Sequence, residues 1–281
     1  MDYKKGFNVK PKEINNIGEV TFTDGTNDFL PNQLQCEAYG YRYDAKSAAC
    51  VAFDYSFKLN TVLDNRTNNI KGGGSAERGT VNSLINGDGN ITEGENRNAF
   101  ITGQENRIPI GLNNSSVLGG RMGKAIRQGE MVLGGGSYNL GAGYTQSSKM
   151  QLSGKTTDAS AVKLEAQDID DAFITLQTNS VVGYDIFITR LETGGASGTA
   201  GQFSYRSNQG AVRVTNTGSI IIYDYQTKTI AKKGVNASFS VVDSTTGGVP
   251  SVTIEVSDRA AVNNLWSATI YLHEIRTNID F

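Results

Sequence analysis

The sequence lacks any long apolar run, and it lacks an apolar stretch near its start. No segment of the 281 residues approaches the ~18 consecutive apolar residues that a membrane-spanning helix needs. The opening stretch, MDYKKGFNVKPKEINN, contains no apolar region of the kind found in a secretory signal. The sequence therefore predicts a protein that does not insert into a membrane and is made and assembled in a cytoplasm.

An excess of charge is also missing, as are the residues that commonly hold metals. The 26 basic and 28 acidic residues give a net charge of -2, so nothing predicts binding to nucleic acid or to an anionic membrane surface. The chain has one histidine, His273, and two cysteines, Cys36 and Cys50, too few for a four-ligand zinc site. We expect no metal and no cofactor. A disulfide between Cys36 and Cys50 is one alternative, and two buried or free thiols, as a cytoplasmic product favours, are the other.

Helix-forming stretches are scarce, and residues that favour strands and turns replace them. Runs rich in Ala, Leu, Glu and Lys are missing, and the chain has only 4 prolines. It has 33 glycines, 12 tyrosines and 11 phenylalanines, with many Val, Ile, Thr, Ser and Asn residues. This composition predicts a fold that is nearly all β.

One short phrase recurs through the middle of the chain. SLINGDGN at Ser83–Asn90 returns as AFITGQEN at Ala99–Asn106, as SVLGGRMG at Ser116–Gly123 and as MVLGGGSYN at Met131–Asn139. Aligning the second apolar residue of each phrase gives a series with gaps of 15 to 19 residues: Ile70, Ile85, Ile101, Leu118, Leu133 and Leu152. A short apolar strand followed by a Gly corner is one rung of a β-roll or β-helix, in which rungs stack about 4.8 Å apart.

The rungs have two expected consequences. Asn side chains at equivalent corners are expected to form a ladder, as the apolar residues do inside. A disordered Gly/Asn-rich linker, the alternative, would need no period. Because apolar pairs bury little surface in each chain, several chains are expected to pool these faces around a common axis, and three is the number expected for fibres of this kind.

The C-terminal third has a different pattern, with short alternating strands separated by Gly- and Ser-rich turns. In Ser251–Ser257 the residues Val252, Ile254 and Val256 are expected to face one way and Thr253 and Glu255 the other. This spacing predicts an antiparallel sandwich. The expected strands are Tyr184–Leu191, Ala211–Thr215, Ser219–Tyr225, Asn236–Val242, Ser251–Ser257 and Leu265–Ile275.

Residues 1–60 carry little apolar periodicity, with Pro11, Pro31 and a single strand-like stretch, GEVTFTDG. An irregular, extended segment that does not fold alone is expected there. Such a segment suits ordering by docking onto another protein.

The middle and the end of the chain together resemble a known arrangement. The repeated phrases resemble the YadA-like adhesin head repeats that recur in bacteriophage tail fibres and spikes. Gln146–Ala166 is similar to the linker that follows such repeats, and Trp266–Ile275 looks like the closing strand of the C-terminal β-domain of those fibres. The resemblance covers roughly residues 65–281.

The resemblance implies a homotrimeric virion protein with three parts. These are an N-terminal attachment segment (residues 1–60) that contacts tail, neck or capsid proteins, a β-roll stalk (61–154) and a C-terminal β-sandwich (155–281) for host-surface contact. Its loops Thr193–Gly201, Ser244–Pro250 and Asp258–Asn264 are where contacts are expected, with the receptor unknown. Alternatives are a head, neck or capsid decoration fibre without a receptor role, a polysaccharide depolymerase tailspike, and a bacterial trimeric surface adhesin, which would need a signal peptide and a membrane anchor.

Residues for catalysis are few, and no catalytic residue is assigned. His273 lies in the middle of an expected strand and is interpreted as structural. Asp168, Asp170 and Asp171 could serve a glycoside hydrolase, but a single nearby aromatic favours a solvated turn. Asn86–Asn90 lacks the spaced acids of a calcium loop and is interpreted as a corner. We therefore expect that the protein is not an enzyme.

Overall fold

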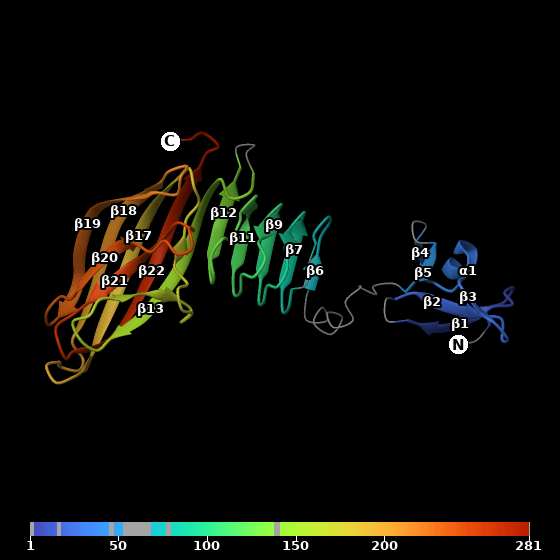
Figure 1. Cartoon of the computed structure of the whole chain (residues 1–281), viewed down its shortest axis with the longest axis horizontal. Helices are drawn as coiled ribbons and strands as arrows, with labels where there is room; N and C mark the ends of the chain where they lie inside the picture. The colour runs from blue at the N-terminus through green and yellow to red at the C-terminus, as the bar shows by residue number, and fades with distance from the viewer. Residues whose placement is uncertain are drawn as a thin grey trace. The chain divides into compact units, whose positions relative to one another are not determined.

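The computed structural model describes residues 3–15, 18–44, 48–52, 69–76, 80–137 and 141–280. The chain divides into two compact units, Met1–Thr67 and Asn68–Phe281 (Figure 1). The expected boundary between residues 60 and 61 falls outside the described residues, as do Tyr138 and Asn139 at the end of the fourth phrase. Strands dominate both units, so the prediction of a nearly all-β fold is confirmed.

The N-terminal unit is irregular, but it is compact rather than extended. Three strands form an antiparallel sheet, two more form a hairpin, and one short helix lies between the two groups. The helix begins after Asn32, whose side chain accepts a hydrogen bond from the Gln35 backbone, while the Asn32 backbone donates to the Gln35 side chain. The elements are β1 (Lys10–Ile14), β2 (Val20–Thr23), β3 (Asp28–Phe29), α1 (Gln33–Ala38), β4 (Arg42–Asp44) and β5 (Ala49–Val51).

A disulfide lies at the centre of this unit. Cys36 of α1 and Cys50 of β5 are bonded and fully buried, together with Val20 and Phe22. Tyr39 packs edge-on against Phe22 with 5.4 Å between ring centroids. Of the two alternatives for the cysteines the structure therefore has the disulfide, and a small core of its own is the reason that the segment is compact.

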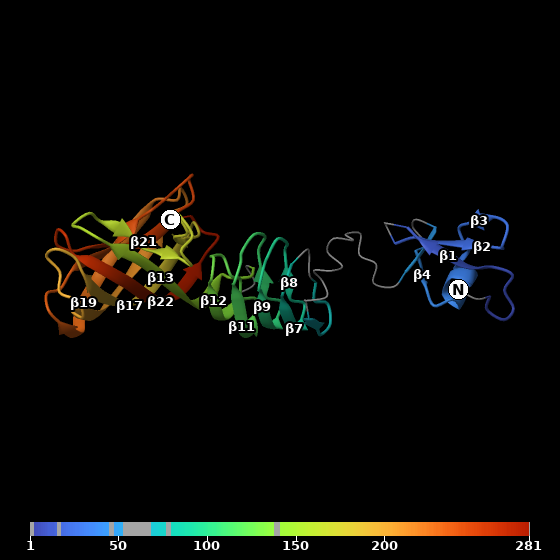
Figure 2. The same ribbon diagram turned by 90° about the horizontal axis from the view of Figure 1, so that it is seen from below.

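The second unit begins with a β-solenoid of about 4 turns (Figures 1 and 2). One face is a parallel sheet, and short strands and single bridges form the rest of each rung. The parallel strands are β6 (Asn69–Lys71), β7 (Leu84–Asp88), β9 (Phe100–Gln104), β11 (Ser116–Arg121) and β12 (Met131–Gly136), and β8 (Ile91–Thr92) pairs with β10 (Arg107–Ile108) on a second face.

The repeat is more regular in the structure than the sequence alignment indicates. The residues in register are Ile70, Ile85, Ile101, Val117 and Val132, spaced 15, 16, 16 and 15 residues apart. Their side chains from Ile85 to Val132 are fully buried.

Three residues of the expected series were therefore misplaced. Leu118 and Leu133 point outward, and Leu133 is 43% exposed. In β11 and β12 the inward residue is the valine of the Val-Leu pair, which comes first. In β7 and β9 the inward residue, Ile85 or Ile101, comes second in its apolar pair. Leu152 belongs to no rung, because it lies in an antiparallel strand and in a different core.

Asparagine ladders at the corners confirm the prediction made for them. The side chains of Asn90 and Asn106 are fully buried, and the Asn106 backbone donates to Asn90 Oδ1 at 3.0 Å. Asn106 Oδ1 in turn accepts from the Gly123 backbone at 2.7 Å. Glycine is required beside this ladder, because a Cβ on Gly87 (φ +115°) would lie 1.9 Å from the Gly103 carbonyl oxygen.

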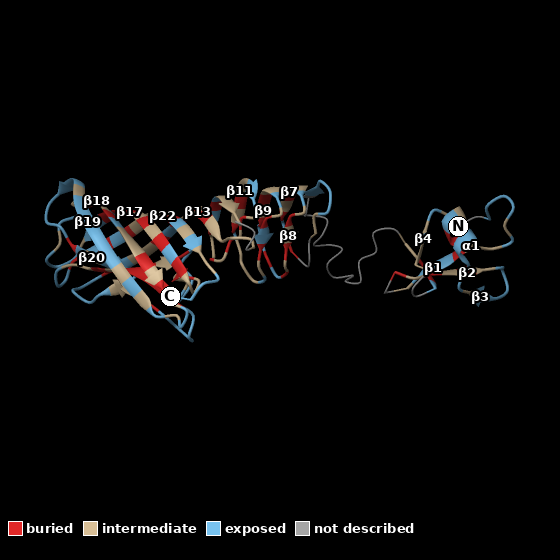
Figure 3. Cartoon of the chain, turned by 90° about the horizontal axis from the view of Figure 1, so that it is seen from above, coloured by how far each residue is buried: buried red, intermediate tan, exposed pale blue. Residues whose placement is uncertain are grey.

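The rest of the second unit consists of two antiparallel sheets that share one core. The core lies between the sheets and contains Trp266, Tyr184, Ile186 and Ile254 among its members (Figure 3). The larger sheet comprises β13 (Thr145–Thr156), β17 (Ser180–Gly194), β18 (Phe203–Val214), β19 (Ile220–Lys233) and β22 (Asn263–Arg276). The smaller comprises β14 (Val162–Lys163), β16 (Ile174–Thr175), β20 (Ser238–Asp243) and β21 (Ser251–Ser257), while β15 (Glu165–Ala166) pairs with β13.

All six expected strands are present, and five of them are shifted at their ends, most by extension. β21 has the predicted bounds and alternates as expected at Val252, Ile254 and Val256. Thr253 differs, because it is fully buried and its hydroxyl donates to the Leu164 carbonyl. The segment around Leu164 covers Thr253, and the sequence of β21 alone does not predict this contact.

The solenoid and the larger antiparallel sheet are one continuous sheet. Among the described residues, its hydrogen-bonded order is β19-β18-β17-β22-β13-β12-β11-β9-β7-β6. β12 pairs in parallel with β11 and antiparallel with β13, so the change from repeat to antiparallel sheet occurs at this strand. β6 and β19 are the two edges of the sheet (Figure 1).

Candidate functional site

The junction between β12 and β13 is the best-defined polar site of the second unit. β12 shifts register between Val132 and Gly134, which bends the strand toward its antiparallel partner. Gly135 permits a close approach here, because a Cβ at this position would lie 2.6 Å from the Gly123 Cα atom. The last rung of the solenoid therefore packs directly against the start of the antiparallel sheet.

A buried ionic cluster stabilises this junction. It consists of Arg127, Glu130 and Glu274. Arg127 Nη1 donates to Glu130 Oε1 at 2.6 Å, and Arg127 Nη2 donates to Glu274 Oε1. Arg127 Nε donates to the Thr175 carbonyl at 2.7 Å. The side chains of Arg127 and Glu130 are fully buried, and that of Glu274 is 8% exposed. One guanidinium thus joins the solenoid, the smaller sheet and β22.

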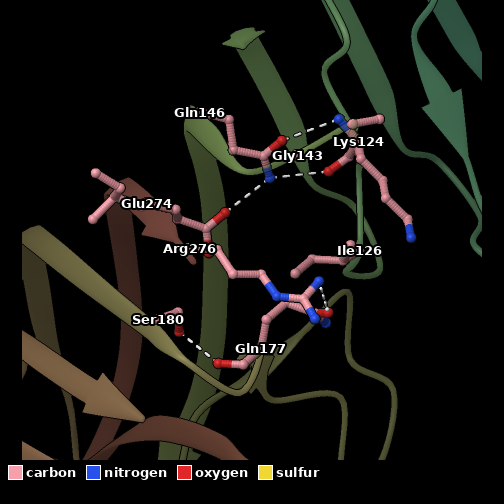
Figure 4. Close-up of a pocket in the computed structure, with 10 residues that line it drawn as sticks. Lys124, Ile126, Gly143, Gln146, Gln177, Ser180, Glu274 and Arg276 are labelled. Carbon is pink, nitrogen blue, oxygen red and sulfur yellow. Dashed lines mark hydrogen bonds between the residues drawn. The ribbon is translucent and has the colours of Figure 1, made fainter. Parts of the chain in front are cut away.

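A glutamine extends the same cluster (Figure 4). Gln146 Nε2 donates to Glu274 Oε2 at 2.8 Å and to the Lys124 carbonyl at 2.9 Å. Gln146 Oε1 accepts from the Lys124 backbone at 3.0 Å, so this side chain pairs with the rung as a strand residue would. The hydrogen bonds of Gln146 therefore link β13 to the last rung, at the point where parallel pairing changes to antiparallel pairing.

The charges in the cluster depend on one another. Burial alone would lower the pKa of Arg127, but the carboxylates of Glu274 and Glu130 outweigh it and raise that pKa above its ordinary value. Burial raises the pKa of Glu130, against the opposing effect of Arg127, and the neighbouring Glu274 raises it further. Removing one partner would leave a buried charge without compensation, so the cluster acts as a unit.

A small cavity adjoins the cluster, lined in part by Gln146, Gln177, Glu274 and Arg276 (Figure 4). Its volume is about 20 Å³, which is close to the space that one water molecule occupies. The Arg276 guanidinium lies 5.0 Å from the centre of the Tyr144 ring, and Nη1 donates to Gln177 Oε1 at 3.3 Å. This space is too small for a sugar ring, and the contacts around it join the solenoid to the antiparallel sheets.

A second buried ionic cluster, formed by Arg190, Glu192, Asp258 and Arg259, lies at the opposite ends of the strands. Arg190 donates to Asp258 Oδ2 and, at 2.7 Å, to the Val235 carbonyl. Arg259 Nη2 donates to Glu192 Oε2 at 3.0 Å. Burial opposes the shift, but the Arg259 backbone and Arg190 lower the pKa of Asp258 below its ordinary value.

This second cluster supports two of the loops expected to make contacts. Glu192 Oε1 accepts from the backbone of Thr199 in the loop Thr193–Gly201, and Asp258 begins the loop Asp258–Asn264. The third loop, Ser244–Pro250, closes with a bridge between Thr246 and Val249. Charged groups beneath the first two loops hold them to the strands.

The residues considered for catalysis lie apart from each other. The side chain of His273 is 62% exposed on β22, with Nε2 3.4 Å from Asp185 Oδ2. Asp168, Asp170 and Asp171 lie in an exposed turn, where Asp168 Oδ1 accepts from Ser153 Oγ at 2.9 Å. Asn86–Asn90 forms a corner of the solenoid.

A groove of about 560 Å³ lies beside the turn and is lined by charges of both signs, from Lys155, Lys163, Glu165 and Asp168. Trp266 also borders it but is only 4% exposed, and its indole nitrogen donates to Thr156 Oγ1 at 3.1 Å. Trp266 therefore belongs to the core and offers no stacking surface to a ligand.

Among the described residues, no group of three or more His, Cys, Asp or Glu side chains could hold a metal ion. In the same ranges, no helix is long and apolar enough to cross a membrane.

The sequence analysis missed both ionic clusters. Their signal is a charged residue at an inward position of an apolar strand. Glu274 continues the series Trp266, Ala268, Ile270 and Leu272, which all face the core. Arg190 continues the inward series of β17 in the same way. Charge at such positions predicts a buried partner, because an unpaired ion there would be costly.

Comparisons with known proteins give structural neighbours only. No protein-family profile matches the sequence, and no curated protein matches it. The structure is similar to the tailspike protein of Acinetobacter baumannii phage AM24, with 8% identity and a TM-score of 0.29 over 76% of this chain and 50% of that chain. The tailspike protein of Acinetobacter phage vB_ApiP_P1 gives 10% identity and a TM-score of 0.26 over 75% and 49% of the two chains.

A third neighbour corrects one expectation. It is tailspike protein gp49 of Acinetobacter baumannii bacteriophage Fri1, described as a capsular polysaccharide depolymerase, with 9% identity and a TM-score of 0.26 over 69% of this chain and 36% of that chain. The chain spans about half the length or less of these neighbours. Because the neighbours are tailspikes and one is an enzyme, the expectation that this chain is not an enzyme is contradicted, and we withdraw it.

Proposed function

We propose that this chain is a structural virion protein of a bacteriophage, a fibre or spike built from three copies. In this proposal the N-terminal unit attaches to other virion proteins. The β-solenoid is the stalk, and the two antiparallel sheets contact the surface of the host cell.

The continuous sheet from β6 to β19 carries the proposal. A solenoid grows only along its axis, since each rung contacts its neighbours alone. Here the last rung does not end freely, because β12 pairs with β13 and the Arg127 cluster joins the rung to two further elements. A stalk that transmits force to a terminal part needs a stiff connection of this kind rather than a flexible linker.

The thin interior of the solenoid supports assembly into trimers. Among the described residues, its buried apolar side chains are alanine, valine or isoleucine at each position, and none of them is aromatic. Short stacks of such rungs need neighbours and covered ends for stability. Closed symmetric assembly supplies the neighbours without another gene product, and β13 covers one end of the stack within the chain.

The ends of the chain support the division of roles. The N-terminal unit has its own core around the Cys36–Cys50 disulfide, which suits a separate attachment module. At the other end, the loops Thr193–Gly201 and Asp258–Asn264 are held by the Arg190 cluster. Loops supported by a rigid scaffold are common binding elements.

Labelling of particles tests the proposal. An antibody raised against the purified chain should label phage particles at a tail, neck or head position in electron micrographs, and the position distinguishes a tail fibre from a decoration fibre. A fragment of residues 65–281 should remain oligomeric, bind host cells and fail to join particles that lack the full-length protein. Particles that never carry the label would contradict a virion role, and a fragment that joins them would reverse the proposed polarity.

A further inference from the structure

The continuous sheet has one face that its own chain leaves uncovered. Residues paired across neighbouring strands lie on the same face of a sheet, and alternate residues lie on the other. The register therefore defines a single outward face that crosses every strand from β7 to β18. One row of it consists of Leu84, Phe100, Ser116, Met131, Lys149, Tyr271, Asp185 and Gln209.

This outward face is rich in apolar residues, although the opposite face already packs on a core. Phe187 stacks on Tyr205 with 6.3 Å between ring centroids and meets the edge of Tyr271 at 6.4 Å. Two further apolar rows flank these rings on the same face. They are Phe203, Leu191 and Leu265 at one end of the strands, and Ile221, Val181 and Ile275 at the other, where Arg213 lies between Ile221 and Val181.

The smaller sheet provides an internal comparison. Four of its outward positions are polar, namely Ser238, Ser240, Glu255 and Ser257, and Val242 is the apolar residue on that face, while its inward positions pack on the core. An antiparallel sheet with one solvated face normally shows this division. The larger sheet does not show this division into a polar and an apolar face, because large apolar side chains lie on both of its faces.

The size of the uncovered surface fits a stable interface. Eight large apolar side chains on the outward face are between 37% and 56% exposed, namely Met131, Val181, Leu191, Phe203, Ile221, Tyr223, Leu265 and Ile275. At roughly 150–200 Å² for each full side chain, they leave on the order of 600 Å² of apolar surface. This area is distributed over both ends of the strands and over the solenoid, and in total it approaches the roughly 800 Å² that each partner contributes to a stable complex.

We infer that the outward face is covered by a second copy of this chain. The face runs over both the solenoid and the antiparallel sheet, so its partner must match a ladder that advances one rung every 15 or 16 residues. A parallel copy of the same chain has the same rise per rung and presents the same two parts in the same order. The inference rests on the proposed trimer and assigns the surface that holds it together.

Charge substitution on the face tests the inference with the full-length chain. Phe187→Lys together with Leu191→Lys places two ammonium groups in the expected interface. The matched control is Ile169→Lys together with Val249→Lys, which changes residues that are 41% and 49% exposed but lie in turns outside the face. Light scattering at micromolar concentration should give about three times 30.1 kDa for the wild type and the control, and about one chain mass for the face variant. The dissociation constant of the face variant should rise by at least about a hundredfold.

Thiol labelling tests whether the outward face is covered, even if the charged variant does not fold. Gln151 lies on the outward face and Thr245 in a loop, and both are exposed in the single chain. A thiol at Gln151→Cys should react more slowly than one at Thr245→Cys, by a factor of about ten or more, because the partner covers it. The native cysteines are bonded to each other and do not compete.

The possible results separate the two claims. A wild-type chain that is monomeric at all concentrations would overturn both the trimer and the assigned face. A trimeric wild type with a fully trimeric face variant, or with equal labelling at the two thiols, would overturn the assigned face and leave the trimer in place.

Discussion

The β-solenoid and the two-sheet part of the second unit exclude water from their interiors in different ways. The solenoid interior combines small apolar residues with buried asparagines, whose side chains bond to the backbone of neighbouring rungs. The two-sheet core contains Trp266, Tyr184 and many Ile, Leu and Val side chains contributed by strands far apart in sequence. One region therefore depends on repetition, and the other depends on the fit of large side chains.

This difference predicts where each region is vulnerable. In the solenoid, each rung packs only against the rungs before and after it, so a single inward charge disturbs the packing of both adjacent rungs. In the two-sheet core, loss of one large side chain leaves a cavity while the strands around it remain paired. Substitutions in the two regions should differ in kind as well as in size.

The largest effect is expected from Ile101→Asp. Ile101 is fully buried between Ile85 and Val117 in the ladder, and its carboxylate replacement would have no partner. We expect a loss of more than about 4 kcal/mol in the free energy of unfolding and no soluble assembled protein. Arg97→Asp, at an exposed corner, should change stability by less than about 0.5 kcal/mol. Equal tolerance of the two variants in thermal unfolding would mean that the inward face is misassigned.

Trp266→Ala should cost about 3 to 5 kcal/mol, as expected for deletion of a large buried side chain. Trp266 is 4% exposed and its indole donates to Thr156 Oγ1, which also accepts from Asn264 Nδ2 and keeps that contact in the variant, so most of the loss comes from packing. Val249→Ala is the control, because Val249 is 49% exposed and lies in a turn outside the proposed interface. Denaturant unfolding of both variants measures the difference, and native fluorescence of the wild type at the wavelength of a solvated tryptophan would contradict the buried position.

A smaller effect is expected from Asn106→Ala, which removes a polar member of the solenoid interior. The change leaves the Gly123 amide and the Thr102 carbonyl without the partner that they have in the wild type. The expected cost is about 2 kcal/mol, the range for buried backbone groups left unsatisfied. Asn98→Gly removes an exposed amide that bonds to Asn114, tolerates the φ of +56° at this position, and should cost much less. If both variants unfold at the same temperature, the buried ladder contributes no more than the exposed one.

The sequence was sufficient for the elements and insufficient for their exact register. Strand positions in the C-terminal third follow from alternation, and β21 was predicted with its full bounds. The rung register failed at Leu118 and Leu133, because the phrases SVL and MVL contain two candidates for the inward position and periodicity alone does not choose between them. Pairing with the preceding rung makes that choice, and it is a property of the fold.

The candidate site was harder to predict than the fold. The cluster joins residues that are far apart in sequence, since Arg127 and Glu274 are brought together only by the pairing of β12, β13 and β22. Alternation along β22 marks Glu274 as an inward residue, but it does not identify Arg127 as the partner. The compact N-terminal unit was missed for a related reason, because its core depends on the Cys36–Cys50 bond rather than on apolar periodicity.

The near-constant spacing of the rungs has a consequence for how such a chain can change over generations. Duplication or deletion of one 16-residue period, from Ile85 to Ile101, inserts or removes a whole rung and leaves every other residue facing as before. The stalk would become longer or shorter by about 4.8 Å per event. An in-frame change that does not match a whole number of rungs would disturb the stacking of the inward residues. Proteins descended from a common ancestor should therefore differ in stalk length by whole rungs, while the N-terminal unit and the antiparallel sheets stay the same.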